Sequence, residues 1–299
     1  MNIHHVFLAS LYPVLRCKFK IAHQMGRVKP RLRVLLFHDI ALSDMDNFAA
    51  QLRWLSARWT FLTPDQFETI LSGEAPLTSD SLLLTFDDGF KSNRVIAERI
   101  LNPMGIQALF FIVPNFASMD SRDNARHFIS KQIYPNLAVS DLPEHWINMS
   151  WNDIQYLLDQ GHTIGSHTLN HARLSQIKNY NDLEYEINQS VILLEKHLGI
   201  QVEHFAYTFG DIASFSQEAL LIASNRFRFV YSGLRGSNPL DNVTPIAIRR
   251  DSLSPSDPFF LVGSFLEGAA DFHYKHSRTI LDRWSSYIHN VSGDNREKI

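Results

Sequence analysis

The chain has 299 residues, 45% of them hydrophobic and 20% charged, a composition typical of a soluble globular protein with a large core. The net charge of −3 argues against nucleic acid as a partner, because phosphate binding requires a basic surface. Cys17 is the only cysteine, so no internal disulfide can form and nothing indicates an oxidising compartment.

The N-terminal region, residues 1–32, combines a short apolar run with basic side chains. Pro13 interrupts the run, which is too short to span a bilayer, and the charges follow it rather than precede it as in a secretory signal. No acidic residue precedes Asp39, whereas the residues before it include the basic Arg16, Lys18, Lys20, Arg27, Lys29, Arg31 and Arg33.

Two interpretations of this region remain open. It is either an ordinary solvated first helix or a basic amphipathic segment lying on an anionic membrane surface. We therefore expect a cytoplasmic protein, with peripheral contact to the inner face of the membrane as the second option.

Short apolar stretches alternate with amphipathic patterns along most of the remaining chain. The pattern predicts strands at residues 33–38, 81–86, 107–113, 162–167, 202–209, 226–232 and 244–250. It predicts helices at residues 46–59, 91–105, 150–161, 182–199, 216–225 and 256–271. Residues 114–148 lack periodicity and predict a long insertion or loop. The alternation favours a parallel sheet, open or closed into a barrel, with its site at the carboxyl ends of the strands.

Two adjacent carboxylates, Asp87 and Asp88, come directly after the apolar strand 81–86. Taken alone they form a common acidic strand-to-loop turn. Neighbouring side chains of an extended chain point in different directions, however. One aspartate could therefore bind a metal ion while the other faces a reacting water.

Two histidines, His167 and His171, are four residues apart. On a helical turn this spacing places both imidazoles on one face, where they can bind one metal ion, although such a pair is more often a surface or core feature. An aspartate and two histidines would leave open metal positions for water. The second aspartate could then take the proton of a water that attacks a carbonyl.

The motifs TFDDGF at 85–90 and SHTLNH at 166–171 resemble those of the polysaccharide deacetylases, the NodB-homology carbohydrate esterases. Weaker similarity lies at 150–165 and 205–211, and the resemblance covers roughly residues 33–251. It implies an irregular (β/α) barrel in which a divalent metal promotes hydrolysis of N-acetyl groups on sugars. The metal would be Zn²⁺ in the first place, with Co²⁺ or Ni²⁺ as alternatives.

By position, the resemblance makes Asp87 the general base and makes Asp88, His167 and His171 the metal ligands. The third motif departs from the family pattern, because Ala206 stands where an arginine is common and Thr208 replaces a proline. The main-chain N–H of Phe209 could still stabilise an oxyanion, since a backbone donor does not depend on the side chain.

The arginine that would orient the catalytic aspartate must then come from elsewhere. Arg249 and Arg250, at the end of the predicted strand 244–250, are the candidates, with a surface ion pair as the alternative for either.

The family also implies a histidine acid after an apolar strand late in the chain. Here the matching pattern, VLLFHDI, lies near the start and contains His38, as in a circularly permuted member. His38 is therefore the candidate acid for the leaving amine, against the alternative of a buried structural histidine. Asp39 could orient its ring or begin a turn.

These features predict a metal-dependent N-deacetylase acting on an N-acetylated saccharide. The alternatives are an O-acetyl esterase acting on a polysaccharide and a non-catalytic saccharide-binding module. We expect a basic N-terminal segment at 1–32, a catalytic domain at 33–290 and a disordered tail at 291–299.

Overall fold

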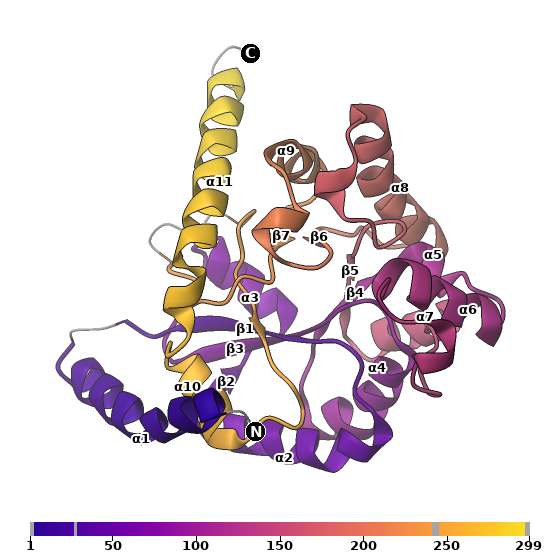
Figure 1. Ribbon diagram of the computed structural model, residues 1–299. Helices are drawn as coiled ribbons and strands as arrows, with labels where there is room; N and C mark the ends of the chain where they lie inside the picture. Colours follow the sequence, from indigo (N-terminus) through magenta and orange to yellow (C-terminus); the bar gives the residue numbers. More distant parts are fainter. Residues whose placement is uncertain (1–2, 27–28, 241–244, 297–299) are drawn as a thin grey trace.

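A computed structural model describes residues 3–26, 29–240 and 245–296 (Figure 1). Its centre is an eight-stranded sheet with the order β7-β6-β5-β4-β3-β1-β8, and β2 pairs with β3 beside this path. All strand pairs are parallel. The strands are β1 (Leu32–Phe37), β2 (Thr60–Phe61), β3 (Ser81–Phe86), β4 (Leu109–Ile112), β5 (Thr163–Ser166), β6 (His204–Ala206), β7 (Phe229–Tyr231) and β8 (Asp251–Ser252).

Helices surround this sheet and account for the continuous burial of its central strands. Every residue of β1, β3 and β4 is buried, as expected for parallel strands covered on both faces. The helices are α1 (Ile3–Gln24), α2 (Met45–Ser56), α3 (Pro64–Leu71), α4 (Lys91–Ile96), α5 (Pro114–Ala117), α6 (Arg122–Phe128), α7 (Trp151–Asp159), α8 (Tyr180–Leu198), α9 (Gln217–Arg226), α10 (Phe259–Leu266) and α11 (Lys275–Arg296).

The irregular (β/α) barrel is confirmed, and its irregular part is the connection between β7 and β1. Residues 245–252 fill this gap. The N–H of Ile248 donates to the carbonyl of Val230 at 3.0 Å, and Asp251 lies in register with Leu35 of β1. The strand predicted at 244–250 is reduced to one bridge, between Ile248 and Tyr231, and the side chain of Asn238 bonds both the N–H and the carbonyl of Arg249. Residue 244 lies outside the described residues.

The predicted insertion at 114–148 is folded rather than an irregular loop. It contains α5, α6 and two further short helical turns, Ile129–Ile133 and Val139–Asp141, around a small apolar core of its own. Arg126 organises it by donating to three backbone carbonyls at 2.7–2.9 Å. Each helix is too short to show a full amphipathic repeat, which is why the periodicity was invisible in the sequence.

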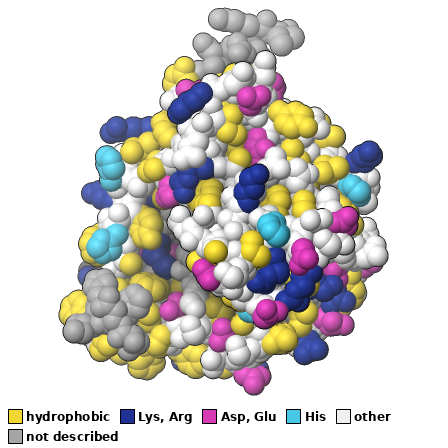
Figure 2. All heavy atoms as spheres, turned by 45° about the vertical axis from the view of Figure 1, so that its right-hand side comes forward, with side chains coloured by type: hydrophobic (Ala, Val, Ile, Leu, Met, Phe, Trp, Pro, Cys, Tyr) yellow, Lys and Arg dark blue, Asp and Glu magenta, His cyan; other side chains and the backbone are white. Residues whose placement is uncertain are grey.

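The start of α1 and the end of α11 lie on opposite sides of the barrel in Figure 1. α1 packs on α10, while α11 runs through Arg296 and so includes most of the expected tail, of which residues 297–299 lie outside the described residues. Within the described ranges, no helix is both long and apolar enough to cross a membrane. Figure 2 shows acidic and basic side chains interspersed over one face.

Candidate active site

The residues predicted to carry the chemistry gather at the carboxyl ends of the central strands. His38 follows β1, Asp87 and Asp88 follow β3, and His167 follows β5. The last residues of β1 and β3 are in register, and the N–H of Asp87 donates to the carbonyl of Phe37 at 2.9 Å. The backbones of His38 and Asp87 therefore run side by side.

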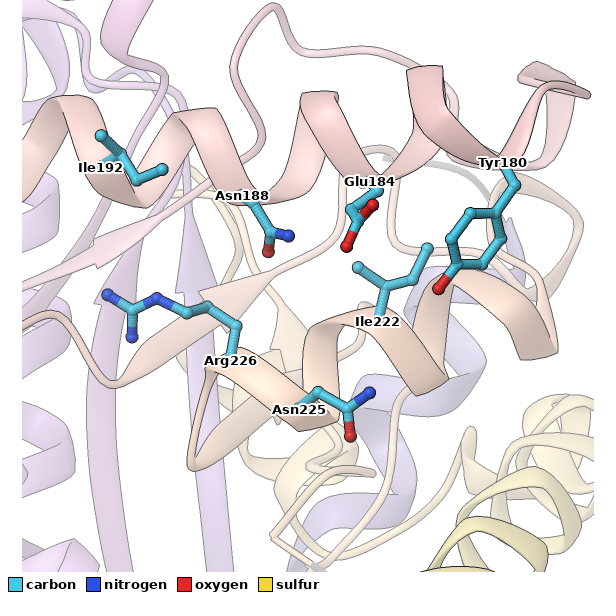
Figure 3. Close-up of a pocket in the computed structure, with 7 residues that line it drawn as sticks. All are labelled: Tyr180, Glu184, Asn188, Ile192, Ile222, Asn225 and Arg226. Atoms are coloured by element: carbon cyan, nitrogen blue, oxygen red, sulfur yellow. The ribbon is translucent and has the colours of Figure 1, made fainter.

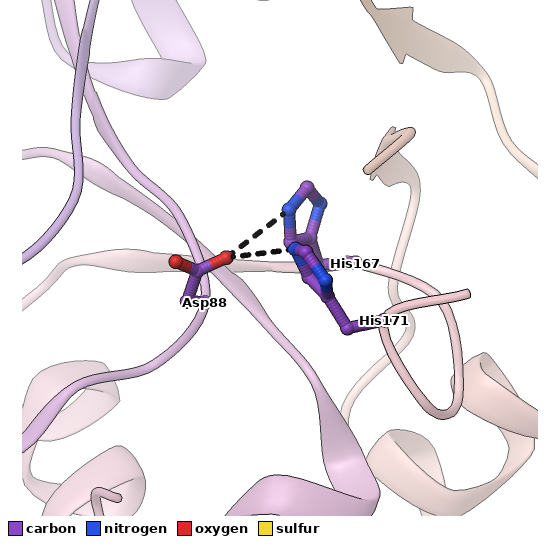
Figure 4. Close-up of side chains that lie close together, drawn as sticks. All are labelled: Asp88, His167 and His171. Atoms are coloured by element: carbon purple, nitrogen blue, oxygen red, sulfur yellow. Dashed lines mark ion pairs between the residues drawn. The ribbon is translucent and has the colours of Figure 1, made fainter. Parts of the chain in front are cut away.

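Asp88, His167 and His171 form a buried group that could hold a metal ion (Figure 4). Oδ1 of Asp88 lies 3.2 Å from Nε2 of His171 and 3.5 Å from Nε2 of His167. The three ligand atoms lie within 4.8 Å of one another.

Both imidazoles are oriented by backbone carbonyls. Nδ1 of His167 donates to the carbonyl of Ala206 at 2.7 Å, and Nδ1 of His171 donates to that of Gln132 at 3.0 Å. A neutral imidazole that donates from Nδ1 presents a lone pair at Nε2. When both imidazoles are neutral, both Nε2 lone pairs therefore face Asp88, and neither can donate a hydrogen bond to it.

The Asp88 carboxylate is accordingly buried without a hydrogen-bond partner for either oxygen within the described residues. Such an orphaned carboxylate is costly unless a cation neutralises it. Burial raises the pKa of Asp88, but the two imidazoles outweigh burial and hold this pKa well below its usual range. Burial lowers the pKa of His167, and the Asp87 and Asp88 carboxylates outweigh it and raise this pKa. The raised pKa of His167 reflects the negative charge of the two carboxylates, and a cation bound beside the orphaned Asp88 oxygens would neutralise that charge.

The two histidines lie on a loop after β5, so the helical turn expected from their spacing is wrong. Thr168 and His171 have positive φ values of 62° and 58°. The other non-glycine residues with positive φ among those described are Asp88 (73°) and Phe209 (63°). Each such conformation costs about 1–3 kcal/mol, and here all of them lie in the site motifs.

The Asp87 carboxylate pairs with a buried arginine. Nη1 and Nη2 of Arg250 donate to its two carboxylate oxygens at 2.6 and 2.8 Å. The same carboxylate lies 3.7 Å from Nε2 of His167. Asp87 therefore borders the Asp88–His167–His171 group while Arg250 fixes its orientation.

The two candidate arginines are thus separated by the structure. Arg250 enters the site from residues 245–252, whereas Arg249 pairs with Asp282 at 2.9 Å on α11. Arg250, which is distant in sequence from Ala206, therefore contacts Asp87, whereas Arg249 pairs elsewhere.

The contacts of Asp39 differ from the two roles predicted for it, which were to orient the His38 ring or to begin a turn. Its Oδ1 accepts a hydrogen bond from Ser92 at 2.7 Å, and its Oδ2 accepts from Nε2 of His145 and Nε1 of Trp146, both at 2.8 Å. It therefore ties the end of β1, next to His38, to α4 and to the insertion. His38 itself is partly buried.

Phe209 lies at the edge of the site, with its ring 4.8 Å from that of His171. The guanidinium of Arg173 lies over this ring, with its Cζ 4.1 Å from the ring centre. Among the described residues, no backbone–backbone hydrogen bond uses the Phe209 N–H. The next residue, Gly210, lies so close to Gly233 that a Cβ atom added to Gly210 would be 2.7 Å from the Cα of Gly233.

The sequence did not identify the insertion residues that border the site. Tyr134 and Trp146 stack with their ring centres 4.6 Å apart, and burial together with the charges of Asp88 and Asp39 raises the pKa of Tyr134. Gln132 contributes only a carbonyl, for which a sequence has no signal. His145 and Trp146 are adjacent in the same insertion, and no strand pattern in the sequence marks either of them as a site residue.

A separate groove of about 290 Å³ lies between α8 and α9 (Figure 3). It is lined by Tyr180, Glu184 and Asn188 of α8 and by Ile222, Asn225 and Arg226 of α9. None of the predicted site residues is among those that line it, so the candidate chemistry stays at the strand ends.

Comparison with known proteins agrees with these motifs. A family model described as polysaccharide deacetylase matches residues 74–225, about half of the chain. YxkH of Bacillus subtilis (strain 168), a polysaccharide deacetylase by name, is 23% identical over 133 residues, which are 42% of this chain and 44% of YxkH. The match thus spans less than half of that relative.

Solved structures share the fold over a larger part of the chain. IcaB from Ammonifex degensii has a TM-score of 0.62 and 22% identity, covering 80% of this chain and 98% of that one. The Streptococcus pyogenes deacetylase PplD, solved with acetate, has a TM-score of 0.62 and 18% identity, covering 80% and 99%. On the family match and this fold, the chain belongs to the polysaccharide deacetylase family.

Proposed function

We propose that the protein is a metal-dependent hydrolase that removes the N-acetyl group from an N-acetylated saccharide. The observation that carries this proposal is the pairing of Arg250 with Asp87 directly beside the Asp88–His167–His171 group. It places a fixed, buried carboxylate next to three potential metal ligands. The cytoplasmic location stays a prediction.

Asp88, His167 and His171 would hold the metal. Two imidazole nitrogens and one carboxylate suit Zn²⁺ and also accept Co²⁺ or Ni²⁺. A divalent cation bound there supplies Lewis acidity, which favours ionisation of water near neutral pH and polarises a carbonyl.

The chain's own residues would perform the proton transfers. Asp87 takes the proton of the water that attacks the acetyl carbonyl, and Arg250 holds its carboxylate in place. The Phe209 N–H donates to the developing oxyanion. His38, beside Asp87, donates a proton to the nitrogen as the bond from carbon to nitrogen breaks. Because an amine leaves only when protonated, an acid at this position favours an N-acetyl over an O-acetyl substrate.

The function can be tested by acetate release. Metal-reconstituted protein is incubated with N-acetylglucosamine oligomers and, separately, with an O-acetylated xylan. We expect release from the oligomers and little from the xylan. Faster release from the xylan would favour the esterase, and no release from a range of N-acetylated and O-acetylated glycans would favour the non-catalytic module.

His38→Gln is expected to lower kcat on N-acetylated oligomers by about 10²–10⁴-fold, the usual contribution of a general acid. Metal content should not change, because His38 lies outside the Asp88–His167–His171 group. The measurement is steady-state acetate release with metal analysis of the same sample. A wild-type kcat would remove His38 as the acid and leave it a structural histidine.

Arg250→Gln should impair both stability and turnover, with Arg249→Gln as the matched control. Removing Arg250 leaves the buried Asp87 carboxylate unpaired, which costs about 3–5 kcal/mol. Arg249 pairs with a half-exposed Asp282, so its loss should cost at most about 1 kcal/mol. Urea unfolding and acetate release measure the two effects. Equal effects of the two substitutions would contradict the assignment of Arg250.

A further inference from the structure

Solvent-facing apolar side chains gather on α1 and α10. On α1, Phe7, Val14 and Ile21 are 60%, 67% and 53% exposed, and on α10 Phe260 is 53% exposed. A spacing of seven residues is close to two helical turns, so the three α1 side chains lie along one side of the helix. We call these four residues, together with Val6 and Phe259, the α1–α10 face.

The opposite side of α1 is already packed against the protein. Leu8 and Tyr12 are buried, and Oγ of Ser264 donates to the carbonyl of Leu8 at 2.5 Å. The ring of Tyr12 lies 5.5 Å from that of Phe260, and a Cβ at Gly263 would approach the Tyr12 ring to 2.4 Å. Because the inner side is filled, the outer apolar side chains are left for a partner outside the chain.

The charges around this face are those that an anionic surface attracts. α1 carries no acidic residue, and Lys18 on it is exposed. The nearby acids Asp80 and Glu267 are both paired with Arg16 and Arg31 at 2.6–3.3 Å. Two of the basic residues expected to contact a membrane, Arg16 and Arg31, thus form ion pairs within the protein. The exposed apolar side chains are therefore the main feature available for membrane contact.

We propose that the α1–α10 face docks on an anionic lipid bilayer. A helix with apolar side chains on one side and an exposed cation such as Lys18 lies in the interfacial plane of such a bilayer. The rival occupant is a second copy of the chain. A two-fold symmetric contact would bring Lys18 of both copies to one apolar interface, which disfavours that occupant. The inference does not depend on the proposed catalytic function.

The test is co-sedimentation with vesicles of phosphatidylglycerol and phosphatidylcholine, compared with phosphatidylcholine alone. The wild-type protein should bind the anionic vesicles, and more weakly at high salt. The triple variant Phe7→Ser, Val14→Ser, Phe260→Ser should bind at least about tenfold more weakly, because it removes three apolar side chains. Lys18→Glu should weaken binding to the anionic vesicles by about tenfold and leave binding to phosphatidylcholine unchanged.

The matched control is Tyr185→Ser with Ile192→Ser on α8, which removes similarly exposed apolar side chains from another surface. It should bind like the wild type. Circular dichroism melting and acetate release from soluble oligomers should be unchanged in all variants, so that a loss of binding is not a loss of folding. Equal vesicle binding by the triple variant, or no binding by the wild type, would overturn the proposal. A dimer in sedimentation velocity that the triple variant loses would assign the face to a second copy instead.

Discussion

Asp87→Asn is expected to lower acetate release from N-acetylated oligomers by about 10³–10⁴-fold. An amide cannot accept the proton of the attacking water, although it has nearly the same shape as the carboxylate. Asp87 lies outside the Asp88–His167–His171 group, so the metal content should stay close to that of the wild type. The measurement is kcat together with metal analysis of the purified variant.

The substitution also leaves Arg250 buried without its counter-charge, so a stability control is needed. Assays are run well below the melting temperature that circular dichroism gives for the variant. Turnover equal to that of the wild type, in a folded and metal-loaded sample, would remove Asp87 as the base. Loss of metal from this variant would instead mean that Asp87 is itself a ligand.

His167→Ala should abolish tight metal binding, with His162→Ala as the matched control. His162 is a buried histidine just before β5, at the opposite end of this strand from His167, and it bonds the backbone N–H of Ala108 and the side chain of Asn102. Both substitutions remove a buried imidazole, but only the first removes a proposed ligand. Metal content after dialysis should fall from about one per chain to near zero in His167→Ala and stay unchanged in His162→Ala.

A second readout is independent of activity. A ligand that binds only the folded state at 100 times its Kd stabilises the protein by about 2.7 kcal/mol. Added Zn²⁺ should therefore raise the melting temperature of metal-stripped wild-type protein and of His162→Ala, but not that of His167→Ala. A full metal load in His167→Ala would refute the ligand set.

Much of the fold could be predicted because the apolar strands and the turns after them are local features. β1 and β3 lie within one residue of their predicted bounds. α3 was missed although Thr63 and Gln66 form a capping box, a signal present in the sequence. The candidate ligands could be named because their motifs are short and specific.

The rest depended on contacts between distant segments. Nothing local distinguishes Arg250 from Arg249, and only the path of residues 245–252 directs the first toward Asp87 and the second toward Asp282. The loop of His167 and His171 could not be foreseen either, because strained φ angles are imposed by surrounding structure rather than by propensity.

Because His171 donates a hydrogen bond to the carbonyl of Gln132, the affinity of the site for a cation depends on the folding of the insertion. A carbonyl that orients one ligand can do so only while its own segment is folded, and the insertion is held by a small separate core. Cation binding at the Asp88–His167–His171 group and folding of the insertion are then linked reciprocally. Because the folded insertion raises the affinity for the cation, the bound cation must stabilise the folded insertion by the same free energy. Evolutionary changes in that small core, far from any ligand, would thus retune how tightly the centre is loaded, without altering a single residue of its motifs.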